Sequence, residues 1–254
     1  MSATPSICAI VPTYNNGGTI IDVVRRVLAE IEHLIVVVDG STDATTDLLR
    51  AEQSKQPERL TVVMSDTNRG KGVALHLGMD TARRMGFTHA ITIDADGQHY
   101  PEDIPLLVEA HMAQPDAIIL GSRLLKQDNM PAQNTFANRF SNFWFAVQTG
   151  LRLPDTQSGF RLYPLDNLHG ERWMTARYEA ELTLLVFSAW AGVPIVPVNV
   201  RVYYPPQNER VSHFRPAYDF ARISLLNTLL CLLALVYGLP RRLFHTLTHA
   251  TRWT

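Results

Sequence analysis

Residues 90–99 read Ala-Ile-Thr-Ile-Asp-Ala-Asp-Gly-Gln-His, an apolar run that ends in two aspartates separated by one small residue. The apolar part predicts a buried strand, and the polar part predicts the loop that follows it. Carboxylate oxygens are the ligands that Mg²⁺ and Mn²⁺ prefer in proteins. Two aspartates at a strand end therefore predict a divalent-cation site, although Asp-x-Asp is also common in turns that cap a helix.

Similar apolar runs occur elsewhere in the first half of the chain, and amphipathic stretches separate them. The runs predict strands at residues 7–11, 34–38, 60–64 and 117–120. The stretches between them predict helices at residues 18–30, 43–55, 70–85 and 101–113. Regular alternation of strands and helices predicts an α/β fold, with a mostly parallel central sheet and helices on both faces.

Beyond residue 125 the alternation is less regular. We expect an aromatic helix at 134–148, a helix at 178–191 and a strand at 195–203. Ile223 to Leu239 is the most apolar stretch and precedes Arg241-Arg242. A membrane crossing takes about 17–25 residues, so this stretch predicts either a short span or a helix lying in the membrane interface. We therefore expect a catalytic domain over 1–215 and a membrane-associating helical segment over 216–254.

The aromatic helix has two interpretations. Its rings could line the side of the active site where a second substrate binds, or contact lipid headgroups, but such a stripe is more often part of the core. The apolar tail nearby favours membrane contact for its aromatic side chains, which are Phe136, Phe140, Phe143, Trp144 and Phe145.

Composition narrows the function classes. The 254 residues carry a formal net charge of -1, so no overall positive field favours nucleic acid as a partner. The two cysteines, Cys8 and Cys231, match neither a disulfide framework nor a metal-ligand spacing, which fits a reducing compartment. The N-terminal residues have no signal-peptide pattern. We expect the protein at the cytoplasmic face of the cell membrane, held peripherally or by its C-terminal helix.

Other strand ends also carry polar residues, and open α/β sheets bind ligands at the carboxyl ends of their strands. Asp39 follows an apolar run and could accept hydrogen bonds from a uracil or guanine, or could simply be a turn residue. Lys71 follows Asn68-Arg69-Gly70 at a helix start, where it could steady a phosphate or could be solvated. The Gly70-Lys71 pair lacks the glycine spacing and the following Ser or Thr of a Walker A loop.

Six sequence blocks, taken together, resemble family 2 glycosyltransferases, and most closely the polyprenyl-phosphate and dolichyl-phosphate sugar synthases. The likeness covers about residues 6 to 203. The blocks are Val11-Pro-Thr-Tyr-Asn15, Val38-Asp-Gly-Ser-Thr-Asp43, Asn68-Arg-Gly-Lys-Gly72, Asp94-Ala-Asp-Gly-Gln-His99, Gly121-Ser-Arg123 and Ser158-Gly-Phe-Arg161. The resemblance implies a GT-A nucleotide-diphospho-sugar transferase fold, an inverting transfer and a nucleotide-sugar donor, and the apolar stretch at 223–239 adds a C-terminal apolar helix to this fold.

The resemblance also implies roles for individual residues. It places Asp94, Asp96 and Gln98 at a Mg²⁺ or Mn²⁺ ion, with Asp94 near the ribose as well. It places Arg123 and Arg139 at the donor diphosphate or the acceptor phosphate. The nucleotide would contact residues from several strand ends, namely Pro12, Tyr14, Asn16, Asp39, Lys71, Asp94 and Ala95.

Three departures from the family pattern bear on the acceptor and the base. Val38 stands where an acidic residue is usual, Asn16 stands where lipid-phosphate synthases often have Glu, and Glu209-Arg-Val-Ser-His213 replaces a late Arg-x-x-Gly-x-Ser-Lys pattern. A phosphate acceptor needs no general base, whereas a hydroxyl acceptor does. Asp155 is the first candidate for that base, with Glu179 and Glu181 behind it.

The sequence thus favours a metal-dependent glycosyltransferase that moves a hexose from a UDP- or GDP-sugar to a lipid or lipid-phosphate acceptor at a membrane surface. One alternative is a nucleotidyltransferase that makes sugar nucleotides, but Pro12-Thr13-Tyr14-Asn15 does not supply the glycine-rich signature expected of one. Another is a catalytically inactive scaffold that binds nucleotide sugar. Intact Asp94, Asp96 and Gln98 argue against that alternative.

Overall fold

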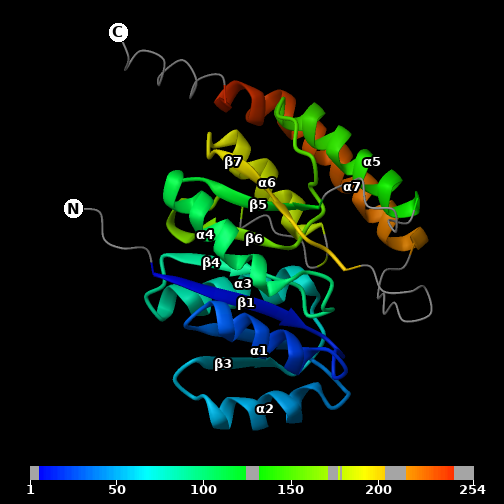
Figure 1. Ribbon diagram of the computed structural model, residues 1–254. Helices are drawn as coiled ribbons and strands as arrows, with labels where there is room; N and C mark the ends of the chain where they lie inside the picture. The colour runs from blue at the N-terminus through cyan, green and yellow to red at the C-terminus, as the bar shows by residue number, and fades with distance from the viewer. Residues whose placement is uncertain (1–5, 124–131, 171–176, 178, 204–215, 243–254) are drawn as a thin grey trace.

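The computed structural model describes residues 6–123, 132–170, 177, 179–203 and 216–242 (Figure 1). Within these residues, seven strands form one sheet in the order β3-β2-β1-β4-β6-β5-β7. The strands are β1 (Ile7–Thr13), β2 (Leu34–Asp39), β3 (Leu60–Ser65), β4 (His89–Thr92), β5 (Ile118–Arg123), β6 (Arg161–Pro164) and β7 (Ile195–Val200). Neighbouring strands are parallel except where β6 pairs antiparallel with β4 and β5.

Helices cover both faces of this sheet. One face carries α1 (Ile20–Glu30), α2 (Thr45–Lys55) and α4 (Ile104–Ala113), the last preceded by the 3-10 turn η1 (Pro101–Asp103). The other face carries α3 (Lys71–Arg84), α5 (Ala132–Thr149) and α6 (Ala180–Trp190), with a short 3-10 turn, η2 (Leu165–Asn167), after β6.

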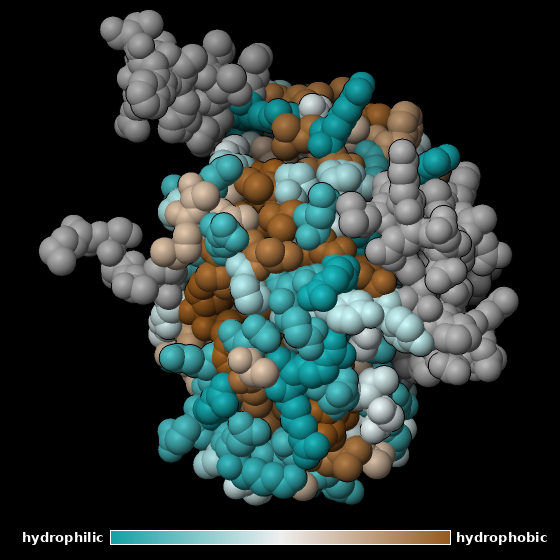
Figure 2. Space-filling view, in the orientation of Figure 1, coloured by the Kyte–Doolittle hydropathy of each residue, from teal (hydrophilic) through white to brown (hydrophobic). Residues whose placement is uncertain are grey.

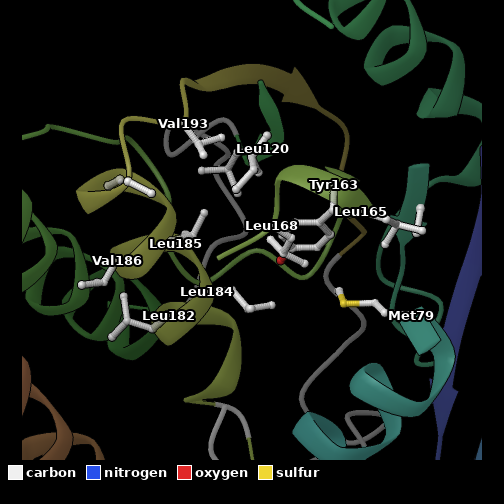
Figure 3. Packing of buried hydrophobic residues seen from close by; sticks show 14 of the residues in the cluster. Met79, Leu120, Tyr163, Leu165, Leu168, Leu182, Leu184, Leu185, Val186 and Val193 are labelled. Carbon is white, nitrogen blue, oxygen red and sulfur yellow. The ribbon is translucent and has the colours of Figure 1, made fainter. Parts of the chain in front are cut away.

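Alternation along the central strand explains the two cores. Cys8 and Ile10 of β1 belong to the cluster under α3 and α6, whereas Ala9 and Val11 belong to the cluster under α1 and α4. Because successive side chains of a strand point to opposite faces, a strand buried on both sides is apolar throughout. Figure 3 shows part of the first core, where α3, α6 and the strands contribute to one cluster that includes Met79, Tyr163 and Leu184.

The C-terminal helix is docked on the domain by its inner side. α7 (Pro216–Leu233) continues into a π-helical turn, η5 (Ala234–Gly238), and lies beside α5 (Figure 1). The Gln148 side-chain amide donates to Asn227 Oδ1 at 2.9 Å, and Leu230 and Ala234 are buried in the core under α6. A Cβ added to Gly238 would lie 2.2 Å from a ring atom of Trp190, so only glycine allows this approach.

The outer side of the same helix is exposed and apolar. Val236 is 78% exposed, and the neighbouring exposed residues are Leu225, Leu229, Leu232, Leu235 and Leu239 on this helix and Phe143 and Val147 on α5. We call these eight side chains the outer apolar face, and Figure 2 shows apolar surface at the end of the molecule where α5 and α7 lie. Ile223–Arg242 is the stretch of the described chain that is long and apolar enough to cross a membrane.

The predicted α/β architecture is confirmed, and each predicted helix and strand lies within a few residues of an observed one. The strand β6 was not predicted, because its residues Arg161–Pro164 include a charged side chain and a proline in a short segment. The strand predicted at 195–203 ends at Val200. Val202 makes only an isolated bridge, with His99.

Candidate active site

The loops after β1 and β2 are held to each other at the carboxyl edge of the sheet. Asn15, in a left-handed conformation with φ of 54°, accepts the backbone N–H of Thr42 at 2.8 Å and donates its own N–H to Ser41 Oγ at 3.0 Å. Asparagine tolerates this backbone region better than most residues do. The contact fixes the distance between two of the predicted nucleotide-binding loops.

Asn16 shapes the loop around Tyr14 and starts α1. Its side-chain Oδ1 accepts the N–H of Tyr14 at 3.2 Å, and its carbonyl accepts the N–H groups of Thr19 and Ile20. Pro12 is buried and Tyr14 is half-buried at the end of the same strand. The three predicted nucleotide-binding residues Pro12, Tyr14 and Asn16 therefore lie together, and their contact with a nucleotide stays a prediction.

Asp39 holds the loop that leads into α3. Its buried carboxylate accepts the N–H groups of Arg69 at 2.8 Å and Gly70 at 2.7 Å. Gly40 permits this close approach, because it has φ of 67° and a Cβ there would lie 2.4 Å from the backbone of Asn68. Both carboxylate oxygens of Asp39 already accept hydrogen bonds, so this side chain links the end of β2 to the loop before α3.

The two aspartates after β4 lie in different local environments. Ala95 is buried between them, and its carbonyl accepts the Thr19 hydroxyl at 2.6 Å. The half-buried Asp96 accepts the N–H of Gln98 at 2.9 Å. Burial and the negative charge of Asp94 raise the pKa of Asp96 to about 6.

Asp94 is paired with a lysine that also binds a glutamate. Lys71 Nζ lies 2.6 Å from Asp94 Oδ1 and 2.8 Å from Glu181 Oε2 at the start of α6. Burial alone would lower the pKa of Lys71, but the charges of Asp94 and Glu181 raise it above its ordinary value. Gly159 packs over this group, since a Cβ there would lie 2.6 Å from Asp94 Oδ2 and 2.9 Å from Lys71 Nζ.

The donor set at this strand end fits a hard divalent cation. Oxygen ligands from Asp94 and Asp96, with Gln98 two residues later, are of the type that Mg²⁺ and Mn²⁺ bind. Burial and the charge of Asp94 raise the pKa of Asp96, and a bound cation would favour its ionised form. Within the described residues, no three His, Cys, Asp or Glu side chains form a ready-made cation site. Metal ligation by these residues stays a prediction.

The loop that carries Gln98 is fastened to the chain after β7. The N–H of Tyr203 donates to the Gln98 carbonyl at 2.8 Å, and Asp103 accepts the N–H of Arg201 at 2.7 Å as well as its guanidinium. The guanidinium groups of Arg26 and Arg201 lie 5.5 Å and 5.2 Å from the centre of the Tyr100 ring. Arg201 thus helps to fix the position of the loop that carries Gln98.

Arg123 and Asp155 form a second charged group at the end of β5. The carboxylate of Asp155 is fully buried and accepts five hydrogen bonds, from the N–H, Nε and Nη2 of Arg123, from Asn138 Nδ2 and from the N–H of Gln157. Burial would raise the pKa of Asp155, but its hydrogen bonds with Arg123 and that residue's charge hold it below its ordinary value. Arg139 lies exposed on the same helix as Asn138.

His99 and Arg161 lie among these groups, although no role for either residue is predicted from the sequence. His99 is buried, and burial lowers its pKa to about 4, with the charges of Asp94, Arg123, Asp155 and Lys71 also acting on it. Arg161 is fully buried and donates to the carbonyls of Ser158 at 2.6 Å and Glu181 at 2.8 Å. Both residues stand in quoted sequence blocks, so their positions were marked even though their contacts were not.

Comparison with known proteins gives consistent matches. The glycosyl transferase family 2 model matches residues 8–166. The chain is 30% identical over 165 residues to polyprenol monophosphomannose synthase of Mycolicibacterium smegmatis, covering 63% of this chain and 62% of that protein. It is 28% identical over 215 residues to UDP-N-acetylglucosamine–dolichyl-phosphate N-acetylglucosaminyltransferase of Methanococcus voltae, covering 78% and 86%.

A solved structure has a similar fold. Glucosyl-3-phosphoglycerate synthase from Mycobacterium tuberculosis, in complex with Mn²⁺, UDP and phosphoglyceric acid, superposes with a TM-score of 0.63 at 19% identity. The match covers 91% of this chain and 79% of that one.

Proposed function

Because the chain belongs to glycosyl transferase family 2, we propose that it transfers a hexose from a UDP- or GDP-sugar to a lipid-linked acceptor, a polyprenyl phosphate, with inversion at the sugar carbon. The chain is a glycosyltransferase with the GT-A fold that its sequence resembles. One relative is named for polyprenol monophosphomannose and another for dolichyl phosphate, which supports a lipid phosphate as the acceptor.

The carboxylate pair after β4 is the observation that carries this proposal. Asp96 and Gln98, with Asp94 beside them, would hold Mg²⁺ or Mn²⁺, which would neutralise the charge on the departing nucleoside diphosphate. The similar solved structure was obtained with Mn²⁺ and UDP, which supports a divalent ion and a nucleotide as ligands of this chain. The buried Ala95 keeps the space between the two aspartates small.

The nucleotide would lie over the loops that Asp39 and Asn15 hold together. Pro12, Tyr14 and Asn16 form one wall in the proposed arrangement. Asp39 contributes by fixing the position of Arg69 and Gly70, whose N–H groups it accepts. A pre-formed site lowers the entropy cost of ordering a ligand.

We revise the expected role of Asp155, because its geometry does not suit a general base. Its carboxylate already accepts five hydrogen bonds. Its lowered pKa also makes it a weak proton acceptor. We propose that Asp155 positions Arg123, and that Arg123 and Arg139 bind phosphate oxygens of the donor or acceptor. A phosphate nucleophile needs no base, so this arrangement favours a phosphate acceptor over a hydroxyl acceptor.

We propose that the outer apolar face lies on the cytoplasmic face of the membrane. The inner side of α7 carries a buried hydrogen bond between Gln148 and Asn227 and packs Gly238 against Trp190. A helix docked in this way matches interfacial association better than a separate span. The helix would bring the active site close to a lipid-linked acceptor.

Sugar transfer tests the function directly. Purified protein with Mn²⁺ is incubated with a short polyprenyl phosphate in detergent and with radiolabelled UDP-glucose, UDP-N-acetylglucosamine or GDP-mannose in turn, and lipid-soluble label is measured. We expect label transfer from one donor and its loss in Asp96→Ala. Wild-type-like transfer by that variant would contradict the metal assignment.

Parallel measurements separate the rival functions. Pyrophosphate release from a nucleoside triphosphate and a sugar 1-phosphate would indicate a nucleotidyltransferase. Binding of a nucleotide sugar without any transfer or donor hydrolysis would indicate an inactive scaffold.

A further inference from the structure

The contact between Lys71 and Glu181 joins the start of α3 to the start of α6. Lys71 Nζ lies 2.8 Å from Glu181 Oε2 and 2.6 Å from Asp94 Oδ1, so one ammonium group bridges two carboxylates. Only 16% of the Lys71 side chain and 6% of the Glu181 side chain are exposed. Charges removed from water to this degree interact strongly, because little solvent screens them.

Glu181 has unused capacity to accept a hydrogen bond. Its Oε1 atom is buried and has no hydrogen-bond partner among the described residues. Glu181 also lies beyond residue 166, where the match to the family model ends. The nearby Arg161 donates to the backbone carbonyl of Glu181 rather than to its carboxylate.

We propose that Glu181 is a positioning residue that holds Lys71 against Asp94. The charges of Glu181 and Lys71 together set how tightly Asp94 and Asp96 bind a divalent cation. The inference rests on the proposed function, since it takes Asp94 and Asp96 as the cation site. Gly159 packs directly against the Asp94 and Lys71 side chains, and any side chain at this position would collide with Asp94 Oδ2 and Lys71 Nζ.

The two members of the pair act on cation affinity with opposite sign. The positive charge of Lys71 repels an incoming cation. Lys71 also binds Asp94 Oδ1, an oxygen that the cation would use as a ligand. The negative charge of Glu181 attracts the cation and restrains the lysine. Removing the lysine charge therefore tightens cation binding, and removing the glutamate charge weakens it. A purely structural contact would give the same sign for both changes, because either loss would loosen the site.

Mn²⁺ binding tests the proposal without any turnover. The full-length protein is titrated with Mn²⁺ alone, and free Mn²⁺ is measured by its electron paramagnetic resonance signal. We expect Glu181→Gln to weaken binding about tenfold and Lys71→Met to tighten it about tenfold, as one unit charge acting in a weakly screened site would do. The double variant should return to within about threefold of wild type, since the two charge changes cancel.

A matched control lies on the other side of the molecule. Glu52 is a buried carboxylate that pairs with Lys55 Nζ at 2.8 Å and with Arg25 at 2.9 Å. Glu52→Gln also removes a paired buried charge, and it should leave Mn²⁺ affinity unchanged. Circular dichroism and thermal unfolding confirm that each variant is folded.

The outcomes are distinguishable. If the wild type binds Mn²⁺ and Glu181→Gln binds it equally or more tightly, the inference is wrong but the proposed function is unaffected. This conclusion does not depend on whether Lys71→Met folds. Absence of Mn²⁺ binding by the wild type overturns the inference as well. If binding is also absent with UDP or GDP present, the metal assignment in the proposed function fails with it.

Discussion

A proton and a divalent cation compete for the carboxylate of Asp96. Burial and Asp94 raise its pKa to about 6, so a cation that binds the ionised carboxylate must displace a proton below that pH. We predict that Mn²⁺ affinity falls about tenfold between pH 7 and pH 5.

Titrations at several pH values check this prediction. The sign follows from the raised pKa, because the ionised fraction of Asp96 falls as the pH drops through 6. Asp96→Asn should bind Mn²⁺ weakly at both pH values. A wild-type affinity that is constant from pH 7 to pH 5 would show that Asp96 is not a ligand.

Gly159 is the residue that leaves room for the charged group. We predict that Gly159→Ala displaces the Asp94 carboxylate or Lys71, because the new methyl would lie 2.6 Å from Asp94 Oδ2. Mn²⁺ affinity and sugar transfer should both fall at least tenfold, a loss of about 1.4 kcal/mol. Gly18→Ala is the control, since a Cβ at Gly18 meets no atom within 4 Å. Equal behaviour of the two variants would contradict the close packing described.

Asp155 stabilises the fold in addition to positioning Arg123. We predict that Asp155→Asn lowers the free energy of unfolding by about 3 kcal/mol or more, because it leaves a nearly buried guanidinium without its counter-ion. The Arg123 side chain is 13% exposed in this pair and Asp155 is 0% exposed. Urea unfolding measures the change, and Asp66→Asn at an exposed position should cost little. A small loss for both would refute the positioning role.

At the scale of elements, α7 presents two sides with different tasks. Its inner side packs against α5 and α6, and its outer side carries six of the eight residues of the outer apolar face, all of them exposed. Each exposed leucine buried in lipid would contribute about 1.5–3 kcal/mol to membrane binding.

Liposome flotation tests the outer apolar face. We predict that Leu232→Asp with Val236→Asp abolishes flotation with anionic vesicles and leaves the thermal unfolding midpoint almost unchanged. Met112→Asp is the matched control, since Met112 is 59% exposed on α4, away from this face. Flotation that survives the double change would place the membrane contact elsewhere.

The elements themselves were largely predictable from local sequence. Apolar β-branched runs such as Val36-Val37-Val38 predict buried strands without further information, and the polar residues after them predict a ligand edge. The antiparallel β6 was not predictable, because its fully buried Arg161 depends on carbonyls that only the folded chain supplies.

Contacts within the site were harder to predict than its residues. The motifs identify Asp94, Asp96 and Lys71, whereas the sequence suggests Glu181 only as an alternative general base to Asp155. Its contact with Lys71 joins two helices far apart in the chain. A similar limit applies to Asp155, which the sequence suggests as a general base, because its contacts with Arg123 and Asn138 are visible only in the folded chain.

At the scale of the whole molecule, the C-terminal helix belongs to the main core. Leu230 and Ala234 are buried in the same cluster as Ile10 and Tyr163. The boundary predicted at residue 215 stays a prediction, and the packing favours one cooperative unit over two. Loss of one buried leucine typically costs about 2–5 kcal/mol.

Truncation tests this view of the domain. We predict that a chain ending at residue 215 loses at least about 3 kcal/mol of stability, as its inner contacts with α5 and α6 disappear. The full chain should unfold in one transition that calorimetry and circular dichroism report at the same temperature. A truncated chain as stable as the full one would show that residues 216–254 are a detachable anchor.

The reversed strand β6 has a consequence for ancestry. It pairs with β4 and β5, and residues 132–160, the described part of the chain between β5 and β6, add no strand to the sheet. A lineage could therefore exchange part of this segment by recombination and keep the order of β1 to β4, as long as Gly159, which packs against Asp94 and Lys71, is retained. Chimeras that exchange α5 and keep Asp155 and Gly159 would test whether this segment influences the choice of acceptor.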